Sequence, residues 1–333
     1  MYEVKKIRGF EIIKVYYDDL EIGLMNYGAG IYSLRTKDFK GVMEDIVLVY
    51  ENIDDYYNNN IYLNASIGPI SGRVKNGEII TKDKTYQLEK NNNGHALHSS
   101  NIGLSYKFFD YEVNEFDEYT EVVFLYEEKD IVSYLCKVIY HVSRDKIRIN
   151  FEVETDQDFV FNLTNHAYFN LSGNLKEKIY NHEVFIRENL RHELSDELLI
   201  SGKLLSEELY NFKKKKLVGS TVKELSSTPK GGIDDIYFIP DNDLRYILAT
   251  VYEPNSGRLI KIRSTYDHLV FYSHNNINEH PLKYLGEHQK HYALCFECQK
   301  SPLGFANEKA SSPYLKKDKL YQESIVFEFS NKH

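Results

Sequence analysis

The 333-residue sequence contains no tryptophan and only three cysteines, so it lacks the means to build a disulfide framework. A reducing compartment is therefore expected. No apolar run approaches membrane-spanning length. The first twenty positions mix charged and apolar residues, so no secretory leader is expected there. Together these absences predict a cytoplasmic protein without a membrane partner.

Positive charge is also in short supply, because 41 basic residues face 50 acidic ones and the formal net charge is −9. This balance argues against nucleic acid and anionic membranes as main partners. The one basic cluster, residues 213–216, is interpreted as a solvated loop. The 28 tyrosines and the frequent Ile and Val favour strands.

Convincing amphipathic helices are few, whereas strand-like alternation recurs throughout the chain. It is clearest at residues 122–126, 134–140, 147–153, 259–263 and 269–273, and residues 143–145 read as a hairpin turn. The best helix candidates are residues 44–58 and 196–214. No repeat and no Pro- or Gly-rich linker occurs. The sequence therefore predicts one domain over residues 1–333, all-β, built as a large antiparallel β-sandwich with few short helices.

Residues 161–171 have two different faces if they form a strand, because side chains alternate across a strand. One face is apolar apart from Asn165. The other face is polar but uncharged and carries a single imidazole; it comprises Asn162, Thr164, His166, Tyr168 and Asn170. A solvent-exposed strand would more typically carry Lys and Glu. The pattern is typical of a pocket wall that contacts a hydroxyl-rich ligand.

Two glycine-rich segments precede this strand. Arg73 lies within residues 67–77, and its guanidinium suits paired hydroxyls or a carboxylate, although an exposed ion-paired Arg is the simpler interpretation. His95 and His98 are three positions apart, which places them on opposite faces of an extended segment. No further ligand follows at zinc-like spacing, so no metal site is expected and one histidine contacting a polar ligand is favoured.

Two segments with acidic residues follow the strand at residues 161–171. Asp234 and Asp235 come after Gly231 and Gly232, where a carboxylate either binds a ligand or caps the turn. Glu297 lies between Phe296 and Cys298 in an apolar strand. Burial would raise the pKa of the Glu297 carboxyl and make it a better base near neutral pH. A structural Glu paired with Arg is the alternative, and Cys295 with Cys298 is read as core rather than as a redox pair.

Taken in order, these segments resemble the aldose 1-epimerase (galactose mutarotase) family. The family's Gly-Arg turn is matched by residues 72–73, and its Thr-Asn-His-x-Tyr-Phe-Asn-Leu motif is matched in full by residues 164–171. Its closing Glu-x-Gln is matched by residues 297–299. Its Leu-His-Gly-Gly and Gly-x-Asp-His segments are matched in part by residues 97–100 and 232–235.

The resemblance implies a galactose mutarotase-like β-sandwich that interconverts the α and β anomers of a free aldose. It implies Glu297 as the catalytic base on the anomeric hydroxyl and His166 as the acid on the ring oxygen. It implies substrate binding by Arg73, His98 and Asp234. Because both steps are proton transfers, no metal and no organic cofactor is expected, and the partner is a small sugar. A monomer or a homodimer is expected.

The sequence departs from the family pattern at four places. Ser99 and Ser100 replace the paired glycines, Asp235 replaces a histidine, Gly77 replaces a frequent arginine, and residues 301–306 keep little of a Pro-Asp-Ala-Pro stretch. None removes a proton-transfer group, but they leave the preferred sugar open. Three other interpretations remain: a non-catalytic carbohydrate-binding or sensing protein, a glycosidase using Glu297 with Asp234, and an epimerase of sugar phosphates.

Overall fold

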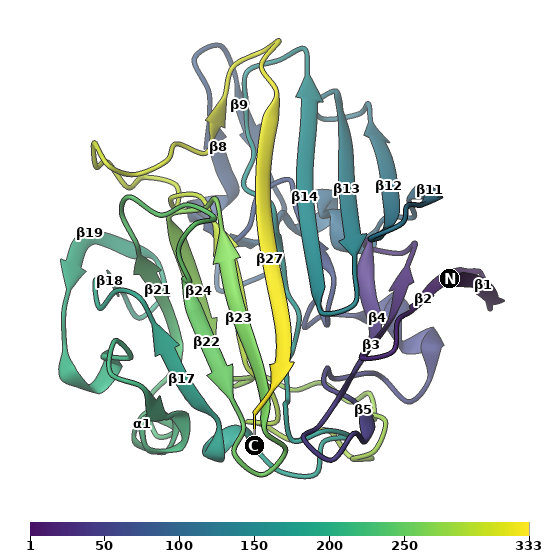
Figure 1. Ribbon diagram of the computed structural model, residues 1–333. Coiled ribbons are helices and arrows are strands. Elements are labelled where there is room, and N and C mark those ends of the chain that lie inside the picture. Colours follow the sequence, from purple (N-terminus) through teal and green to yellow (C-terminus); the bar gives the residue numbers. More distant parts are fainter. Residues whose placement is uncertain (333) are drawn as a thin grey trace.

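The computed structural model describes residues 1–332, and a nine-stranded antiparallel sheet is its largest element (Figure 1). Strand β27 (Tyr321–Asn331) lies inside this sheet between β14 (Lys146–Thr155) and β23 (Arg258–Ser264). The sheet continues beyond β14 through β13 (Tyr134–Val142) and β12 (Thr120–Glu128) to β11 (Asp110–Glu115). Beyond β23 it continues through β22 (Ala249–Tyr252) and β17 (Glu183–Ile186) to β20 (Lys216–Leu217).

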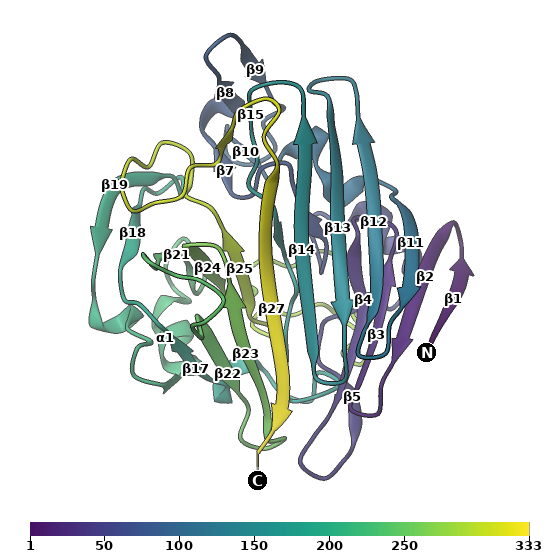
Figure 2. The same ribbon diagram turned by 45° about the horizontal axis from the view of Figure 1, so that its top comes forward.

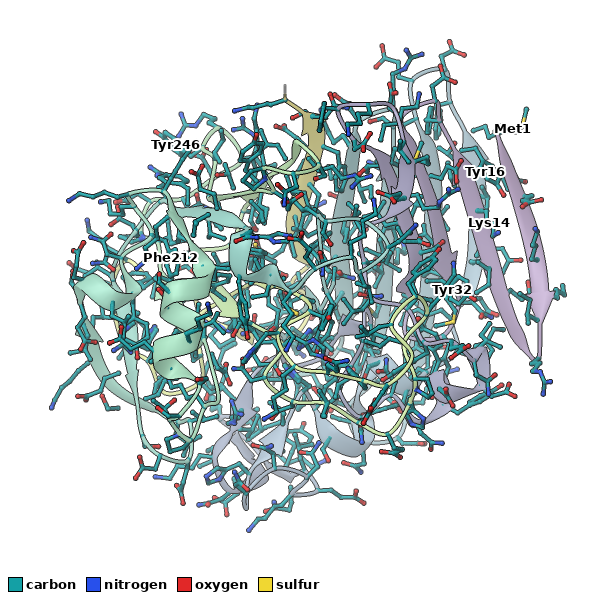
Figure 3. The ribbon with its side chains drawn as sticks, turned by 90° about the horizontal axis from the view of Figure 1, so that it is seen from below. Met1, Lys14, Tyr16, Tyr32, Phe212 and Tyr246 are labelled. Atoms are coloured by element: carbon teal, nitrogen blue, oxygen red, sulfur yellow. The ribbon has the colours of Figure 1, made fainter. Side chains whose placement is uncertain are left out.

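Two five-stranded sheets accompany the large one (Figure 2). The first, in chain order, comprises β1 (Tyr2–Ile7), β2 (Phe10–Tyr16), β3 (Leu20–Met25), β4 (Gly30–Lys37) and β5 (Met43–Asp45). The second, in spatial order, comprises β19 (Ile200–Leu205), β18 (Arg191–Leu194), β21 (Asp234–Phe238), β24 (His268–Tyr272) and β25 (Cys295–Gln299). In Figure 3 the strands around Met1, Lys14 and Tyr16 lie at the opposite edge of the molecule from Phe212.

Four two-stranded pairs complete the sheets. They are β6 (Ser66–Ile67) with β16 (Thr164–Asn165), β7 (Arg73–Val74) with β10 (Ala96–Leu97), β8 (Glu78–Ile80) with β9 (Thr85–Gln87), and β15 (Phe159–Val160) with β26 (Tyr314–Leu315). The architecture is all-β, as the sequence predicts. All five strands predicted with clear alternation are present, and so is the hairpin at residues 143–145.

The alternation works as expected because one face of each long strand meets the core. On β14 the side chains of Ile147, Ile149, Phe151 and Val153 are at most 1% exposed, while those between them reach the other face. Fully burying an apolar side chain of this size stabilises the fold by roughly 1.5–3 kcal/mol. The main core therefore lies on this inner face of the nine-stranded sheet.

Both helix predictions are wrong. Residues 44–58 hold the end of β5 and the short 3₁₀ turn η1 (Ile53–Asn58), and residues 196–214 hold β19 and the 3₁₀ turn η6 (Glu208–Tyr210). Strand β19 pairs with β18, so its backbone hydrogen bonds are made across a hairpin, and Gly202 within it has φ +89°. Tertiary pairing therefore overrides the helical spacing of its apolar residues.

The one α-helix among the described residues is α1 (Val218–Leu225), which the sequence does not predict. Its buried Val218, Val222 and Leu225 have helical spacing, but Val and Gly are poor helix formers. Gly219 is needed because a Cβ there would lie 2.6 Å from the Tyr180 carbonyl oxygen. The remaining helical turns are 3₁₀: η2 (Lys75–Gly77), η3 (Ser100–Ile102), η4 (Leu104–Tyr106) and η5 (Ile179–Asn181). Over residues 1–332, no helix has the length and apolar character needed to span a bilayer.

A buried arginine ties the N-terminal sheet to the segment that carries His166. The Arg258 guanidinium is 2% exposed and donates to the carbonyls of Thr36, Val42 and Leu171 and to the Glu44 carboxylate at 3.0–3.3 Å. A charged group this deep is tolerated because it is paired and hydrogen-bonded. The end of the segment at residues 161–171 is thereby held between two sheets.

Candidate active site

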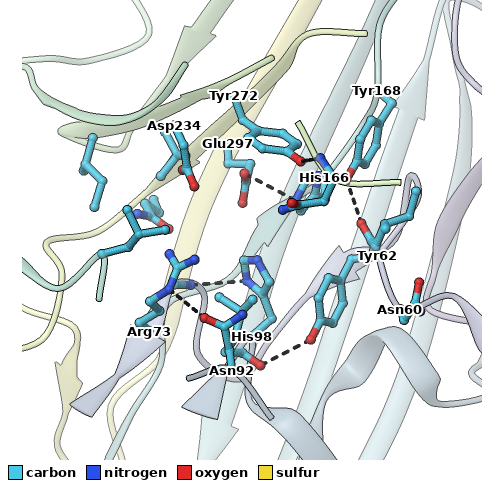
Figure 4. A pocket seen from close by; sticks show the side chains of 18 of the residues that line it. Asn60, Tyr62, Arg73, Asn92, His98, His166, Tyr168, Asp234, Tyr272 and Glu297 are labelled. Carbon is cyan, nitrogen blue, oxygen red and sulfur yellow. Dashed lines mark hydrogen bonds and ion pairs between the residues drawn. The ribbon is translucent and has the colours of Figure 1, made fainter. Parts of the chain in front are cut away.

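The five predicted site residues meet around one cavity, although 224 positions separate the first from the last. The cavity has a volume of about 360 Å³ and its walls include Arg73, His98, His166, Asp234 and Glu297 (Figure 4). They come from β7, the turn after β10, the residue after β16, the start of β21 and the middle of β25. The cavity combines these polar groups with apolar and aromatic walls, which is typical of a small-molecule site.

His166 and Glu297 lie next to each other on the wall of this cavity. The imidazole Nε2 lies 3.5 Å from a Glu297 carboxylate oxygen, and the two side chains are 7% and 4% exposed. Burial lowers the pKa of His166 to about 4. Burial, together with repulsion from Asp234, raises the pKa of Glu297 to about 8, while Arg73 opposes the rise. Strongly shifted pKa values in a cleft are typical of functional groups.

Aromatic stacking orients the His166 ring. The ring lies parallel to Tyr168, with centroids 4.8 Å apart, and Tyr62 lies roughly parallel at 6.4 Å. The His166 Nδ1 atom is buried and makes no hydrogen bond to another described residue. Nε2 is therefore the ring nitrogen that points toward Glu297 and the cavity.

The prediction of a polar strand face is only partly correct. Strand β16 covers just two residues, and only His166 and Tyr168 of the five polar positions line the cavity. The Asn162 side chain bonds the Lys300 backbone, and the Asn170 amide bonds the carbonyls of Glu177 and Tyr292. These residues are polar because they satisfy buried backbone groups, which a sequence pattern does not distinguish from ligand contact.

His98 offers a hydrogen-bond donor to the cavity. Its Nδ1 accepts from the Gly72 backbone N–H at 3.3 Å, so the proton of the neutral ring resides on Nε2. Burial and repulsion from His166 and Arg73 hold the pKa of His98 well below its usual range, so the ring is neutral at pH 7. His95, its neighbour in the motif, accepts from the Asn76 N–H and lies 3.3 Å from Glu197, outside the cavity.

The two serines that replace the family's glycines keep the glycine-like backbone. His98, Ser99 and Ser100 have φ of 51°, 66° and 48°, the left-handed region that glycine adopts most easily. The buried Ser99 hydroxyl accepts from the Ile70 N–H at 2.7 Å and donates to the Ile70 carbonyl at 2.9 Å. These two bonds join the His98 turn to the segment that leads into Gly72 and Arg73.

Asp234 and Asp235 point to opposite sides of β21, as alternation requires. Asp234 is half-buried, lines the cavity, and has its pKa raised by burial against the opposing effect of Arg73. Asp235 is fully buried behind the sheet, 2.7 Å from Lys230 and 3.2 Å from Arg191. The Asp235 departure therefore alters a buried ion-pair cluster rather than the cavity wall.

Several cavity residues were not predicted. They are Asn60, Tyr62, Asn92, Tyr272 and Asn276. Asn92 accepts from Arg73 Nε at 3.1 Å and so orients the guanidinium. The sequence marks Asn92 and Asn60 only as loop residues. Gln299 also lines the cavity, on the same face of β25 as Glu297, and alternation from Glu297 would have found it.

The structure also brings together three side chains that could ligate a metal ion. Ligand atoms of His98, His166 and Glu297 lie within 4.8 Å of one another, a proximity that the spacing of the sequence motifs does not indicate. Metal-bound histidines almost always donate their second N–H to an acceptor. Here His98 Nδ1 faces the Gly72 donor, and His166 Nδ1 bonds no other described residue. The imidazoles are therefore arranged for hydrogen bonding to a ligand rather than for metal binding.

Comparison with known proteins gives one consistent result. The family model described as aldose 1-epimerase matches residues 15–328. A galactose mutarotase from Bos taurus is 26% identical over 315 residues, covering 94% of this chain and 92% of that protein. An aldose 1-epimerase from Streptococcus thermophilus is 28% identical over 269 residues, covering 78% and 75%.

Solved structures show the same fold. An aldose epimerase homologue from C. elegans superposes with a TM-score of 0.85 at 21% identity, covering 97% of this chain and 99% of that one. A galactose 1-epimerase from Lactobacillus acidophilus NCFM gives a TM-score of 0.83 at 18% identity, with 99% and 97% covered. With a family match over nearly the whole length and this shared fold, the chain belongs to the aldose 1-epimerase family.

Proposed function

We propose that this protein interconverts the α and β anomers of a free aldose, with Glu297 and His166 as the proton-transfer pair. The observation that carries the proposal is the approach of His166 Nε2 to the Glu297 carboxylate, 3.5 Å apart in a buried cavity. O1 and O5 of a pyranose are both bonded to C1, so the groups that serve them must be close together. General acid–base catalysis needs each group within hydrogen-bond reach of its proton.

The reaction follows from this geometry once the single proton that the pair holds at neutral pH has passed from the Glu297 carboxyl to His166 Nε2, 3.5 Å away. Glu297 removes the proton of the anomeric hydroxyl, the O1 electrons form the C1=O1 double bond, and the C1–O5 bond breaks. O5 takes the proton from His166 Nε2, which gives the open-chain aldehyde. Rotation about C1–C2 presents the other face of the carbonyl. His166 then removes the O5–H proton, O5 attacks C1, and Glu297 returns its proton to O1. No proton is gained or lost over the cycle.

The remaining predicted residues bind the sugar. Arg73 and the His98 Nε2–H donate to hydroxyl oxygens, and the Asp234 carboxylate accepts from a hydroxyl. Asn92 keeps the Arg73 guanidinium in place. Neutral imidazoles and a raised Glu297 pKa suit an uncharged ligand, because the pair holds one proton between its members at neutral pH. A free aldose is therefore favoured over a sugar phosphate.

Polarimetry across several free aldoses and their 6-phosphates tests this function. Freshly dissolved α-D-glucose or α-D-galactose is expected to reach anomeric equilibrium faster with the protein than in buffer alone. Calorimetry on the same preparation reports binding. Binding without acceleration would support a carbohydrate sensor instead, and acceleration restricted to the phosphates would reassign the substrate class.

A further inference from the structure

A second chamber adjoins the sugar cavity on the far side of Arg73. It has a volume of about 370 Å³ and shares five wall residues with the first cavity: Gly72, Arg73, Leu198, Ile236 and Gln299. Neither His166 nor Glu297 lines it. The two chambers therefore adjoin each other, but the proton-transfer pair belongs to the first alone.

The chemistry of the reaction limits what the second chamber can hold. Ring opening needs a free hydroxyl on C1, and the two oxygens on that carbon must lie within hydrogen-bond reach of Glu297 and His166. A group in the second chamber must then be attached through a different carbon of the same sugar. An aldose extended at a non-anomeric position, with its reducing end in the first cavity, meets both conditions.

The walls of the second chamber suit another sugar ring. Ile79, Leu199 and Leu303 supply apolar surface, and Ile80 and Tyr314 are left 62% and 52% exposed. A pyranose presents C–H groups on its faces, which pack on such side chains, and hydroxyls at its edge. Ser201, Lys75 and Glu78 provide polar contacts for these hydroxyls.

A hairpin from the second five-stranded sheet forms the partition between the chambers. Leu198, at the turn between β18 and β19, lines both, and it has a left-handed φ of 60°. The adjacent Glu197 lies 3.3 Å from His95, which follows the Asn92 loop. The hairpin tip thus contacts the segment that leads to His98, and Leu198 and Arg73 line both chambers.

We propose that the preferred substrate is a reducing disaccharide, whose second ring occupies this chamber while its reducing ring is opened and closed by the catalytic pair. The inference rests on the proposed anomer interconversion and specifies its substrate class. It assigns Ile80, Ser201 and Tyr314 to a second sugar subsite.

The test compares D-glucose with maltose, cellobiose and isomaltose, which carry a second glucose on O4 or O6. For at least one disaccharide, kcat/KM is expected to exceed that of glucose by about tenfold, which corresponds to about 1.4 kcal/mol of added binding. Ser201→Trp and Ile80→Trp fill the chamber from exposed positions. Each is expected to abolish this advantage while leaving glucose turnover unchanged.

Lys203→Trp is the matched control, because Lys203 is exposed on the same strand as Ser201 but lies outside the chamber. It should change neither substrate. Three disaccharides that are all poorer than glucose would overturn the subsite, as would tryptophan variants that slow glucose and disaccharide equally. A protein that converts neither class fails the proposed function itself, whereas one that converts glucose alone fails only this inference.

Discussion

At the scale of single residues, the proposed mechanism depends on the number of protons that the His166–Glu297 pair holds. Ring opening and ring closure each need one proton on the pair, so the active range lies between the pKa of about 4 for His166 and about 8 for Glu297. Below this range both groups are protonated and no base remains. Above it both have lost their protons and no acid remains.

A plateau with two falling limbs is therefore expected for kcat/KM against pH. On the alkaline side, the rate should fall about tenfold per pH unit above pH 8, once the buffer-catalysed rate is subtracted. Polarimetric initial rates from pH 5 to 10 measure this limb. A rate that keeps rising through pH 9 would contradict the requirement that the His166–Glu297 pair holds one proton.

Replacing Glu297 by Gln is expected to abolish turnover and to stabilise the protein at alkaline pH. The pKa of Glu297 is raised from 4.5 to about 8 in the folded state. Its contribution to stability is therefore fully present below pH 4.5 and is lost as pH rises toward 8. Gln keeps the shape without the charge, so the variant should gain a few kcal/mol over the parent at pH 8 and little at pH 4.5. Urea unfolding at both pH values measures the difference, and a less stable variant would identify Glu297 as half of a structural ion pair.

His166→Asn should lower kcat by roughly 10²–10⁴-fold while sugar affinity changes little, because Asn cannot deliver a proton at neutral pH. His141→Asn is the matched control. His141 also faces a glutamate, Glu121, at 2.8 Å, but it lies on β13 outside the cavity. The control should keep parental kinetics. Near-normal turnover in the His166 variant would limit that residue to orienting the sugar.

At the scale of elements, the two hydrogen bonds between Ser99 and Ile70 hold together two segments that we propose bind the sugar. Ser99→Ala removes both hydrogen bonds to Ile70 and leaves the buried Ile70 N–H without that partner. A loss of about 1–3 kcal/mol of stability is expected. Because Arg73 and His98 are proposed to bind the sugar rather than to transfer protons, KM should rise while kcat stays unchanged. Ser100→Ala, at the next left-handed position, is the control for backbone strain. Equal KM values in the two variants would contradict a role for these two hydrogen bonds.

The sequence predicts the long strands and the five cavity residues well, for a physical reason. Strands such as β14 alternate because one face meets a large core, and the chemistry-bearing motifs contain residue types that are costly to bury without a purpose. Glu297 is the clearest case. The local spacing of apolar residues gives the wrong prediction where strand pairing determines the secondary structure. Residues 196–214 have a helical spacing of apolar residues, although they contain β19, which pairs with β18 in a hairpin.

The loop residues of the cavity escape sequence reasoning for a different reason. Tyr62 reaches His166 from a position with φ +58° in an irregular segment, where no periodicity applies. Asn162 and Asn170 were predicted to face a ligand, but they do not. Their side chains hydrogen-bond the backbone of Lys300, Glu177 and Tyr292 instead. Only three-dimensional contacts separate these two uses of asparagine.

At the scale of the whole molecule, the site is built from the protein's own side chains, and chelators are expected to leave the rate unchanged. His98, His166 and Glu297 come close enough to capture a metal ion, but neither imidazole has an acceptor at its second nitrogen. Mutarotation after dialysis against EDTA, with and without added Zn²⁺, is the measurement. Lost activity that a divalent ion restores would show that this triad holds a metal after all.

The position of β27 has a consequence for how the chain acquires its shape during synthesis. This strand follows every other strand in sequence, yet it joins β14 to β23 in the middle of the largest sheet (Figure 1). While the ribosome has not yet released residues 321–331, the two halves of that sheet expose unpaired edges that could pair with other nascent chains. The nine-stranded sheet can therefore close only after β27 has been synthesised. A chaperone that shields open strand edges would act in that interval.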